Sequence, residues 1–223
     1  FAQTSSIAEQ LPVVFDFGDG DFFAGTIDSV EAPANLRLRW RFWNVGPEYS
    51  IWCALSPAGA QIELSVIDCG SESVAEAESL REGWDDFLMR FEKRVTSGEP
   101  CRYRWTESIG ATCYAPDSDA LWTGLHAPAY WRALFPLAEV DCRVEPQGDV
   151  RLEIRDSSWP AALVTHAHVR NVTHRGLSCL RITHTGFTQL PEPSQVDARR
   201  NYARIWCGLL ESIESRFAGL AAA

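Results

Sequence analysis

The chain repeats one pattern of elements twice, and this internal repeat limits its possible folds more than any other feature. Apolar residues spaced three and four positions apart predict one amphipathic helix after Ser73 and another after Ser194. When the two predicted helices are aligned, these apolar positions coincide: Trp84 with Trp206, Phe87 with Leu209, Leu88 with Leu210, and Phe91 with Ile213. At 223 residues, the chain is long enough for two modules that each bury a core.

Antiparallel strands are predicted ahead of each helix. Alternation of apolar and polar residues with a period of two predicts strands over residues 35–43, 61–68 and 178–184. Turn residues between apolar runs also predict two hairpins, which we interpret as counterparts in the two halves. They are formed by residues 13–17 with 22–30 and by residues 140–144 with 150–154.

The predicted fold class is therefore α+β, with a sheet followed by a long C-terminal helix in each half. We expect a first module at residues 1–96, a linker at 97–100 and a second, complete module at 101–220. The second half also contains a predicted strand over 105–113 and two short helices through Trp122 and Trp131. The first half has no equivalent segment. Because the chain begins without Met, we expect that this opening strand and its helices were trimmed away; a reduced module is the alternative.

Composition narrows the partners and the compartment. The chain has 30 acidic and 20 basic side chains, a net charge of −10, which argues against nucleic acid or anionic lipid as a partner. Its apolar runs are too short to span a membrane. Seven cysteines form an odd set without a C-x-x-C pair and no signal peptide is evident, so we expect reduced thiols in the cytoplasm. One lysine beside nineteen arginines indicates a GC-rich bacterial genome.

Short motifs in both halves carry a family resemblance. The first half contains Pro33–Trp40 as a Pro-x-x-Leu-x-x-x-Trp strand and Gly83–Leu88 as a Gly-Trp-x-x-Phe-Leu helix, and the second contains Leu180–Phe187 as a Leu-x-Ile-x-His-x-Gly-Phe strand end. The chain thus resembles the helix-grip fold of the START/Bet v-like (SRPBCC) superfamily, and most closely its activator-of-heat-shock-ATPase-homologue branch. It departs from that branch at Ile205, where the family has Gly. The resemblance implies that each curved sheet wraps around its helix and leaves an apolar cavity between them.

Histidines supply the candidate catalytic groups. All five, at positions 126, 166, 168, 174 and 184, lie in the second half. His166, His168 and Arg170 share one side of a predicted strand, and His184 shares a face with Leu180 and Ile182 that we expect to point inward. One reading is acid/base catalysis by His184 on a ligand whose oxygens His166, His168 and Arg170 polarise. The alternative places His166 and His168 in solvent and makes His184 a hydrogen-bonded core residue. No metal site or cofactor is predicted, because acidic or cysteine partners are missing at ligand spacing.

Aromatic and aliphatic side chains of the second half supply the candidate cavity walls. A planar ligand could stack on tryptophan, although aromatic side chains more often fill a core. Tyr130 and Trp131 rank highest, because in the family the second short helix borders the cavity mouth. The predicted ligand-binding residues are Trp105, Trp122, Tyr130, Trp131, Trp159, Leu180, Ile182 and Trp206.

Three functions are compatible with these features. The leading hypothesis is binding of a hydrophobic, polycyclic or aromatic small molecule in a bacterial polyketide-type pathway, by a carrier, a self-resistance protein or a cyclase-like enzyme. Whether turnover occurs is left open. The alternative is a co-chaperone or protein-interaction module, as the branch name implies. In a third version, the first module only supports the second. A module without its opening strand leaves a sheet edge free, which favours a homodimer.

Overall fold

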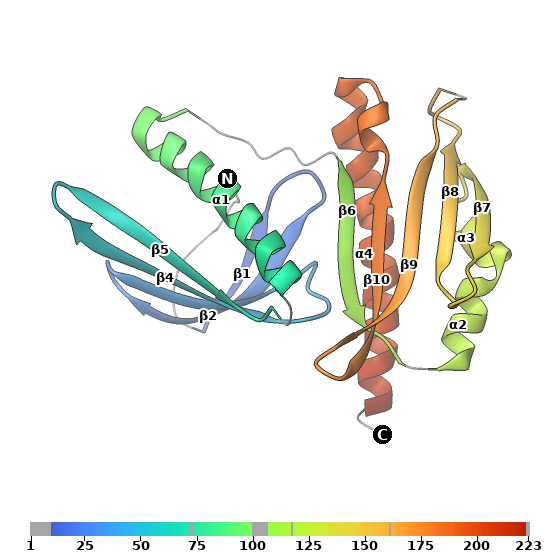
Figure 1. Cartoon of the computed structure of the whole chain (residues 1–223), viewed down its shortest axis with the longest axis horizontal. Coiled ribbons are helices and arrows are strands. Elements are labelled where there is room, and N and C mark those ends of the chain that lie inside the picture. The colour runs from blue at the N-terminus through green and yellow to red at the C-terminus, as the bar shows by residue number, and fades with distance from the viewer. Residues whose placement is uncertain (1–9, 72–73, 100–106, 117, 161, 222–223) are drawn as a thin grey trace. The chain divides into compact units, whose positions relative to one another are not determined.

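The chain consists of two units, each with one antiparallel sheet and one long helix (Figure 1). The computed structural model describes residues 10–71, 74–99, 107–116, 118–160 and 162–221. The units comprise residues 1–103 and 104–223. The predicted α+β class, with two sheets that each precede a helix, is confirmed. The predicted linker ends at residue 100, outside the described residues. Within the described chain, no helix has an apolar stretch long enough to cross a membrane.

The first unit is a five-stranded meander followed by α1. Each strand pairs with the next one in the sequence, in the order β1-β2-β3-β4-β5, and we call this sheet A. Its elements are β1 (Pro12–Asp16), β2 (Phe22–Glu31), β3 (Asn35–Phe42), β4 (Tyr49–Ala58), β5 (Gln61–Cys69) and α1 (Val74–Ser97). The β1–β2 turn is tight because Gly18 and Gly20 adopt left-handed φ angles of 79° and 99°.

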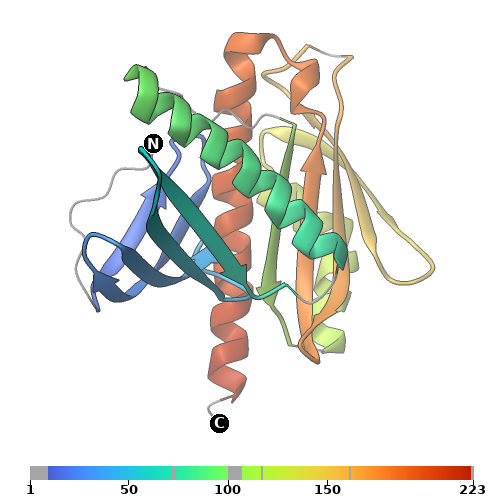
Figure 2. The same ribbon diagram turned by 60° about the vertical axis from the view of Figure 1, so that its left-hand side comes forward.

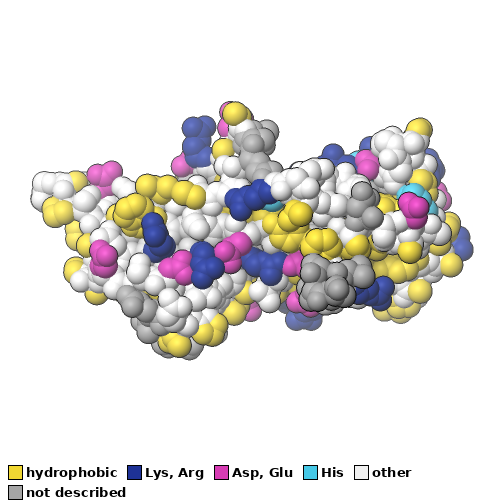
Figure 3. Space-filling model, turned by 90° about the horizontal axis from the view of Figure 1, so that it is seen from below, with side chains coloured by type: hydrophobic (Ala, Val, Ile, Leu, Met, Phe, Trp, Pro, Cys, Tyr) yellow, Lys and Arg dark blue, Asp and Glu magenta, His cyan; other side chains and the backbone are white. Residues whose placement is uncertain are grey.

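The core of the first unit is formed mainly by side chains from the strands of sheet A. Val13, Ile27, Leu38 and Ile51 are buried there. Among the described side chains of α1, Trp84 is the one that packs against this cluster; its ring stacks on Trp40 with centroids 5.6 Å apart. Met89 and Val95 of the same helix are 60% and 65% exposed. Hydrophobic side chains are visible at the surface of both units in Figure 3.

The second unit inserts an opening strand and two short helices before its meander. The strand order is β6-β10-β9-β8-β7, which we call sheet B. Its elements are β6 (Ser108–Tyr114), α2 (Asp119–His126), α3 (Pro128–Leu134), β7 (Ala138–Val144), β8 (Val150–Asp156), β9 (Thr165–His174), β10 (Leu177–Thr185), the short helix η1 (Phe187–Gln189) and α4 (Glu192–Ala221). The long helix α4 runs along one face of sheet B (Figure 2).

The two sheets correspond when they are counted back from their helices. β5 then matches β10, and the hairpin β7–β8 matches β2–β3 rather than β1–β2, which corrects the pairing of hairpins inferred from the turns. In sheet B the opening strand β6 pairs with the edge of β10. In sheet A, no described strand pairs with the equivalent edge of β5.

Polar contacts fasten α4 to β6. The Arg199 side chain is 1% exposed, and its Nε donates to the carbonyl oxygen of Ser108 at 3.0 Å. Near the other end of β6, the backbone N–H of Tyr114 donates to Oε2 of Glu214 at 3.0 Å. Between these contacts, Trp206, Leu210 and Ile213 of α4 are buried. The stripe predicted from the sequence is thus the face of α4 that covers the interior of sheet B.

Candidate functional site

His184 lies at the centre of the second unit, on the face of sheet B that α4 covers. Its side chain is fully buried. The indole Nε1 of Trp206 lies 3.1 Å from Nδ1 of His184, and because an indole nitrogen can only donate, Nδ1 is the acceptor. The ring proton therefore resides on Nε2, which donates to Oγ1 of Thr165 at 2.9 Å. Both ring nitrogens are engaged.

Burial also sets the charge of this histidine. Removal from water, together with a smaller contribution from the charge of nearby His166, lowers the pKa of His184 from 6.5 to about 3. The ring is therefore neutral at physiological pH. A neutral imidazole acts as a base through its unprotonated nitrogen, which here is occupied by Trp206. In this arrangement, His184 can accept a proton from a ligand only after it releases that hydrogen bond.

Aromatic rings surround His184 on the inner face. Ring centroids of Phe187 and Tyr202 lie 4.6 and 5.0 Å from that of His184. Phe135 packs on both Tyr202 and Trp206, and Trp131 contacts Trp206 at 6.0 Å. Four of the predicted ligand-binding residues are fully buried in this interior: Trp131, Leu180, Ile182 and Trp206. These side chains are packed against one another like a protein core.

An apolar hollow of about 480 Å³ lies at the surface of the second unit, beside this aromatic interior. Its described lining consists of Pro160, Ala162, Leu163, Gln189, Leu190 and Pro191. The lining comes from two segments: one follows Trp159, and the other continues from Phe187. Trp159 is half-buried, and its ring lies 6.5 Å from Phe187 and 5.4 Å from Tyr202. The residues just before the two lining segments, Trp159 and Phe187, thus belong to the aromatic interior around His184.

The remaining predicted wall residues lie away from His184. Trp122 of α2 is half-buried and contacts His126, with ring centroids 6.0 Å apart. Tyr130 of α3 is 36% exposed and packs edge-on against Trp131. Trp105 lies outside the described residues.

The polar residues predicted to assist His184 face the opposite side of sheet B. His166, His168 and Arg170 alternate along β9 with the buried Ala167 and Val169. They contribute to a second hollow, of about 380 Å³, whose charged lining also includes Arg143, Arg151 and Glu153. The predicted catalytic set is therefore divided between the two faces of the sheet.

Sequence reasoning missed several partners of His184. Thr165 carries no signal in the sequence, because a lone threonine at a strand start has no distinctive spacing. Phe187 ends the Leu180–Phe187 motif, and Tyr202 lies four positions before Trp206 in the predicted helix. Neither pattern shows that these side chains contact His184. The Tyr202 hydroxyl also donates to Oδ2 of Asp156 at 3.0 Å, a contact between residues 46 positions apart.

Comparisons with known proteins establish the fold. No protein-family model and no curated protein matches the sequence. Among solved structures, DynU16, described as a protein of the dynemicin biosynthetic locus, superposes with a TM-score of 0.82 at 23% identity, over 96% of this chain and 87% of that chain. The di-domain ARO/CYC StfQ of the steffimycin biosynthetic pathway matches with a TM-score of 0.31 at 14% identity, over 98% and 88%. The second TM-score is too low to relate the two arrangements. The similarity to DynU16 shows that this chain has the helix-grip fold in two tandem modules.

Proposed function

We propose that the chain binds a hydrophobic, polycyclic or aromatic small molecule in its second unit and serves a natural-product pathway. The observation that carries the proposal is the apolar hollow beside Trp159, next to an interior made of aromatic rings. Its volume of about 480 Å³ falls within the roughly 300–1,000 Å³ of small-molecule sites, but the hollow is a shallow, open depression, so a bound ligand would keep one face in solvent. A flat ligand would rest against the proline and leucine side chains and stack on the half-buried Trp159.

The biosynthetic setting is supported by the description of DynU16, which assigns that protein to the dynemicin biosynthetic locus. We extend that setting to this chain on the strength of a shared fold, and with it membership of the SRPBCC superfamily. Since fold alone does not determine function, the ligand-binding test below is the deciding one. Five expectations from the sequence stay predictions. They are the heat-shock-ATPase-activator branch, the co-chaperone role, the homodimer, the absence of a nucleic-acid partner and the cytoplasmic location.

The packing around His184 favours a carrier or sequestering protein over an enzyme. Both nitrogens of His184 are hydrogen-bonded, and Phe187 packs against both the His184 ring and Trp159. A cyclase reaction would require the ligand to move Phe187 aside and take over the Trp206 hydrogen bond. Binding in the hollow requires neither change.

The proposal is tested by titrating a hydroxylated three-ring aromatic compound, 1,8-dihydroxyanthraquinone, into the full chain. Quenching of tryptophan fluorescence and isothermal calorimetry report the affinity. Trp159→Ala should weaken binding by about twofold to tenfold, the loss expected when a stacking contact worth roughly 0.5–1.5 kcal/mol is removed.

Trp52→Ala is the matched control, because Trp52 is 45% exposed on sheet A, in the other unit. It should leave the affinity unchanged. Equal affinities for Trp159→Ala and wild type would overturn the proposed site. An absence of binding by this compound and by four-ring analogues would overturn the proposed function.

A further inference from the structure

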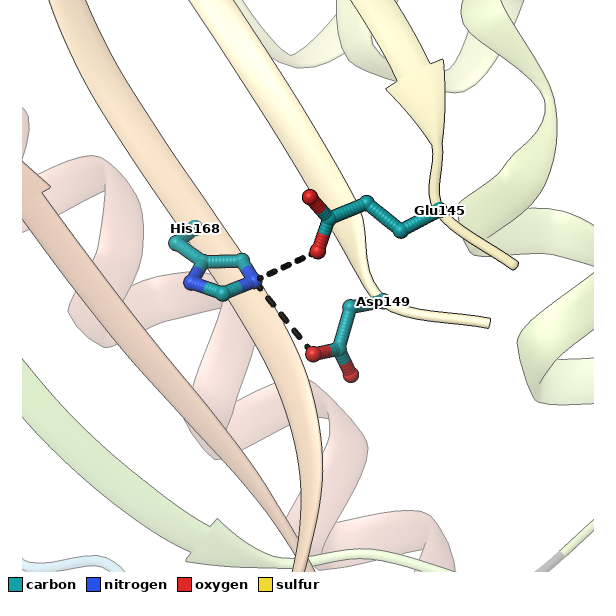
Figure 4. A group of neighbouring side chains, drawn as sticks. All are labelled: Glu145, Asp149 and His168. Atoms are coloured by element: carbon teal, nitrogen blue, oxygen red, sulfur yellow. Dashed lines mark ion pairs between the residues drawn. The ribbon is translucent and has the colours of Figure 1, made fainter. Parts of the chain in front are cut away.

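A mixed cluster of one histidine and two carboxylates lies on the outer face of sheet B. His168 projects from β9, and Glu145 and Asp149 flank the turn between β7 and β8 (Figure 4). All three side chains are partly buried. The cluster is formed by segments about twenty residues apart, so no local sequence motif marks it. It lies on the face opposite His184, and it does not depend on the proposed ligand site.

The distances within the cluster exceed those of hydrogen bonds. Nε2 of His168 lies 3.5 Å from Oε2 of Glu145 and 3.4 Å from Oδ2 of Asp149. A direct N–H···O hydrogen bond would place these atoms about 2.7–3.2 Å apart. The Nε2 atom is also shielded from solvent and, within the described chain, has no hydrogen-bond partner. The Nε2 atom therefore faces both carboxylates without a direct hydrogen bond to either of them.

The same distances suit shared coordination of a metal ion. Zinc binds imidazole nitrogen and carboxylate oxygen at about 2.0–2.2 Å, so two ligand atoms of a tetrahedral site are about 3.4 Å apart. The distances from Nε2 of His168 to the Glu145 and Asp149 carboxylate oxygens match this separation between two ligand atoms. One candidate ligand atom from each of the three residues lies within 4.8 Å of the others. Imidazole with two carboxylates is a ligand set that zinc, manganese and iron accept.

The surrounding contacts hold the Glu145 carboxylate and the backbone of the turn in place before a metal arrives. Arg151 pairs with Oε1 of Glu145, and Gln147 donates to Oε2 at 2.7 Å. The turn is closed by the backbone N–H of Glu145, which donates to the carbonyl of Asp149 at 2.8 Å. Nε2 of His126 donates to the carbonyl of Gly148 at 2.8 Å and ties the turn to α2. Outer contacts of this kind orient metal ligands in known sites.

We propose that Glu145, Asp149 and His168 form a binding site for a first-row divalent cation, with zinc as the first probe. Neutral imidazole and two carboxylates carry a charge of −2, which the cation would neutralise. His168 also lines the 380 Å³ hollow with Arg143 and Arg170.

The test is calorimetry with zinc chloride on the full chain after treatment with a chelator. We expect one zinc ion per chain. His168→Gln and Asp149→Asn should each weaken binding by more than about tenfold, since even outer contacts change metal affinity by about 10–100-fold. His166→Gln is the matched control: His166 lies two residues away on the same face of β9 and should leave the affinity unchanged. Circular dichroism checks that each variant is folded.

Cobalt substitution separates this site from the cysteines. Cobalt bound by nitrogen and oxygen gives visible bands without the ultraviolet sulfur-to-metal charge-transfer band that thiolate ligands produce. The visible bands should disappear in His168→Gln and persist in His166→Gln. A sulfur band, or equal zinc affinity in wild type and His168→Gln, would overturn the proposal. Loss of binding in His166→Gln to the same extent as in His168→Gln would overturn it as well.

Discussion

Replacing His184 by glutamine should remove most of the acid sensitivity of the second unit. Glutamine can accept a hydrogen bond from Trp206 and donate one to Thr165, but it does not titrate. In the wild type, burial lowers the pKa of His184 from 6.5 to about 3. The unfolded chain therefore binds a proton below pH 6.5, whereas the folded unit binds it only near pH 3.

The sign and size of the effect follow from this difference. The stabilisation by neutral His184 is complete above pH 6.5, decreases as the pH falls, and is exhausted near pH 3. Between pH 6.5 and pH 3, the free energy of unfolding falls by at most about 5 kcal/mol through this group, since each unit of pKa change is worth about 1.4 kcal/mol. Over this range, the free energy of unfolding of the wild type should fall by about 1.4 kcal/mol per pH unit more than that of His184→Gln.

Urea unfolding at several pH values, followed by hydrogen-exchange mass spectrometry, measures this difference. Peptides from β10 and α4 report on the second unit, so unfolding of the first unit does not obscure the result. The control is His166→Gln, which removes the smaller, charge contribution to the pKa of His184 but leaves the ring buried, so most of the wild-type slope should remain. Parallel curves for the wild type and His184→Gln would show that burial of this ring does not govern acid stability.

Three other substitutions test the packing. Phe187→Ala should destabilise the second unit by about 3–5 kcal/mol in urea unfolding, because a fully buried ring leaves a cavity; a loss below 1 kcal/mol would contradict the packed interior. Trp84→Phe removes the Nε1 hydrogen bond to Oδ2 of Asp68 (2.8 Å) and should cost about 1 kcal/mol in the first unit only, as exchange in α1 peptides would show. Gly25→Ala would place a Cβ 1.9 Å from the carbonyl oxygen of Arg39 and should destabilise sheet A by about 1–3 kcal/mol; unchanged exchange in β2 and β3 would refute this.

Most of the fold could be predicted because its elements have regular apolar spacing. Residues 35–42 alternate between leucine or aromatic side chains and arginine, and they form β3 as predicted. The two long helices begin within a few residues of the predicted positions, since Trp84 and Trp206 both lie on long apolar stripes. The spacing of apolar and polar residues predicts an element correctly when one face of that element is buried and the other is exposed.

β4 was missed because both of its faces carry apolar side chains. Ile51 is buried, but Trp52, the next residue, is 45% exposed on the opposite face, where the guanidinium of Arg37 lies 5.5 Å from its ring. Leu55 is also exposed, and Pro57 lies near the end of the strand. Because an exposed tryptophan follows a buried isoleucine, apolar and polar residues do not alternate along this strand. The contact that stabilises it is tertiary, so the sequence does not show it.

The candidate sites were predictable only in part, because their residues meet through the sheet register. Alternation on β10 correctly turned His184 inward, but Thr165 and Trp206, its partners, lie 19 and 22 positions away. Likewise, a metal site was not predicted because His168 has no acidic neighbour at short spacing. The carboxylates of Glu145 and Asp149 reach it from the β7–β8 turn, because β8 pairs directly with β9.

The two histidines show how one sheet can support two kinds of chemistry. His184 and His168 lie on adjacent strands, but His184 pairs with Ala167 and His168 pairs with Thr183, so their side chains point to opposite faces. On the inner face, burial keeps the ring neutral and surrounds it with aromatic groups, which suits an uncharged guest. On the outer face, carboxylates and arginines surround the ring, which suits a cation or an ion pair. A side chain cannot cross a paired strand, so a hydrophobic ligand and a metal ion would occupy separate places. Loss of one activity should therefore leave the other intact.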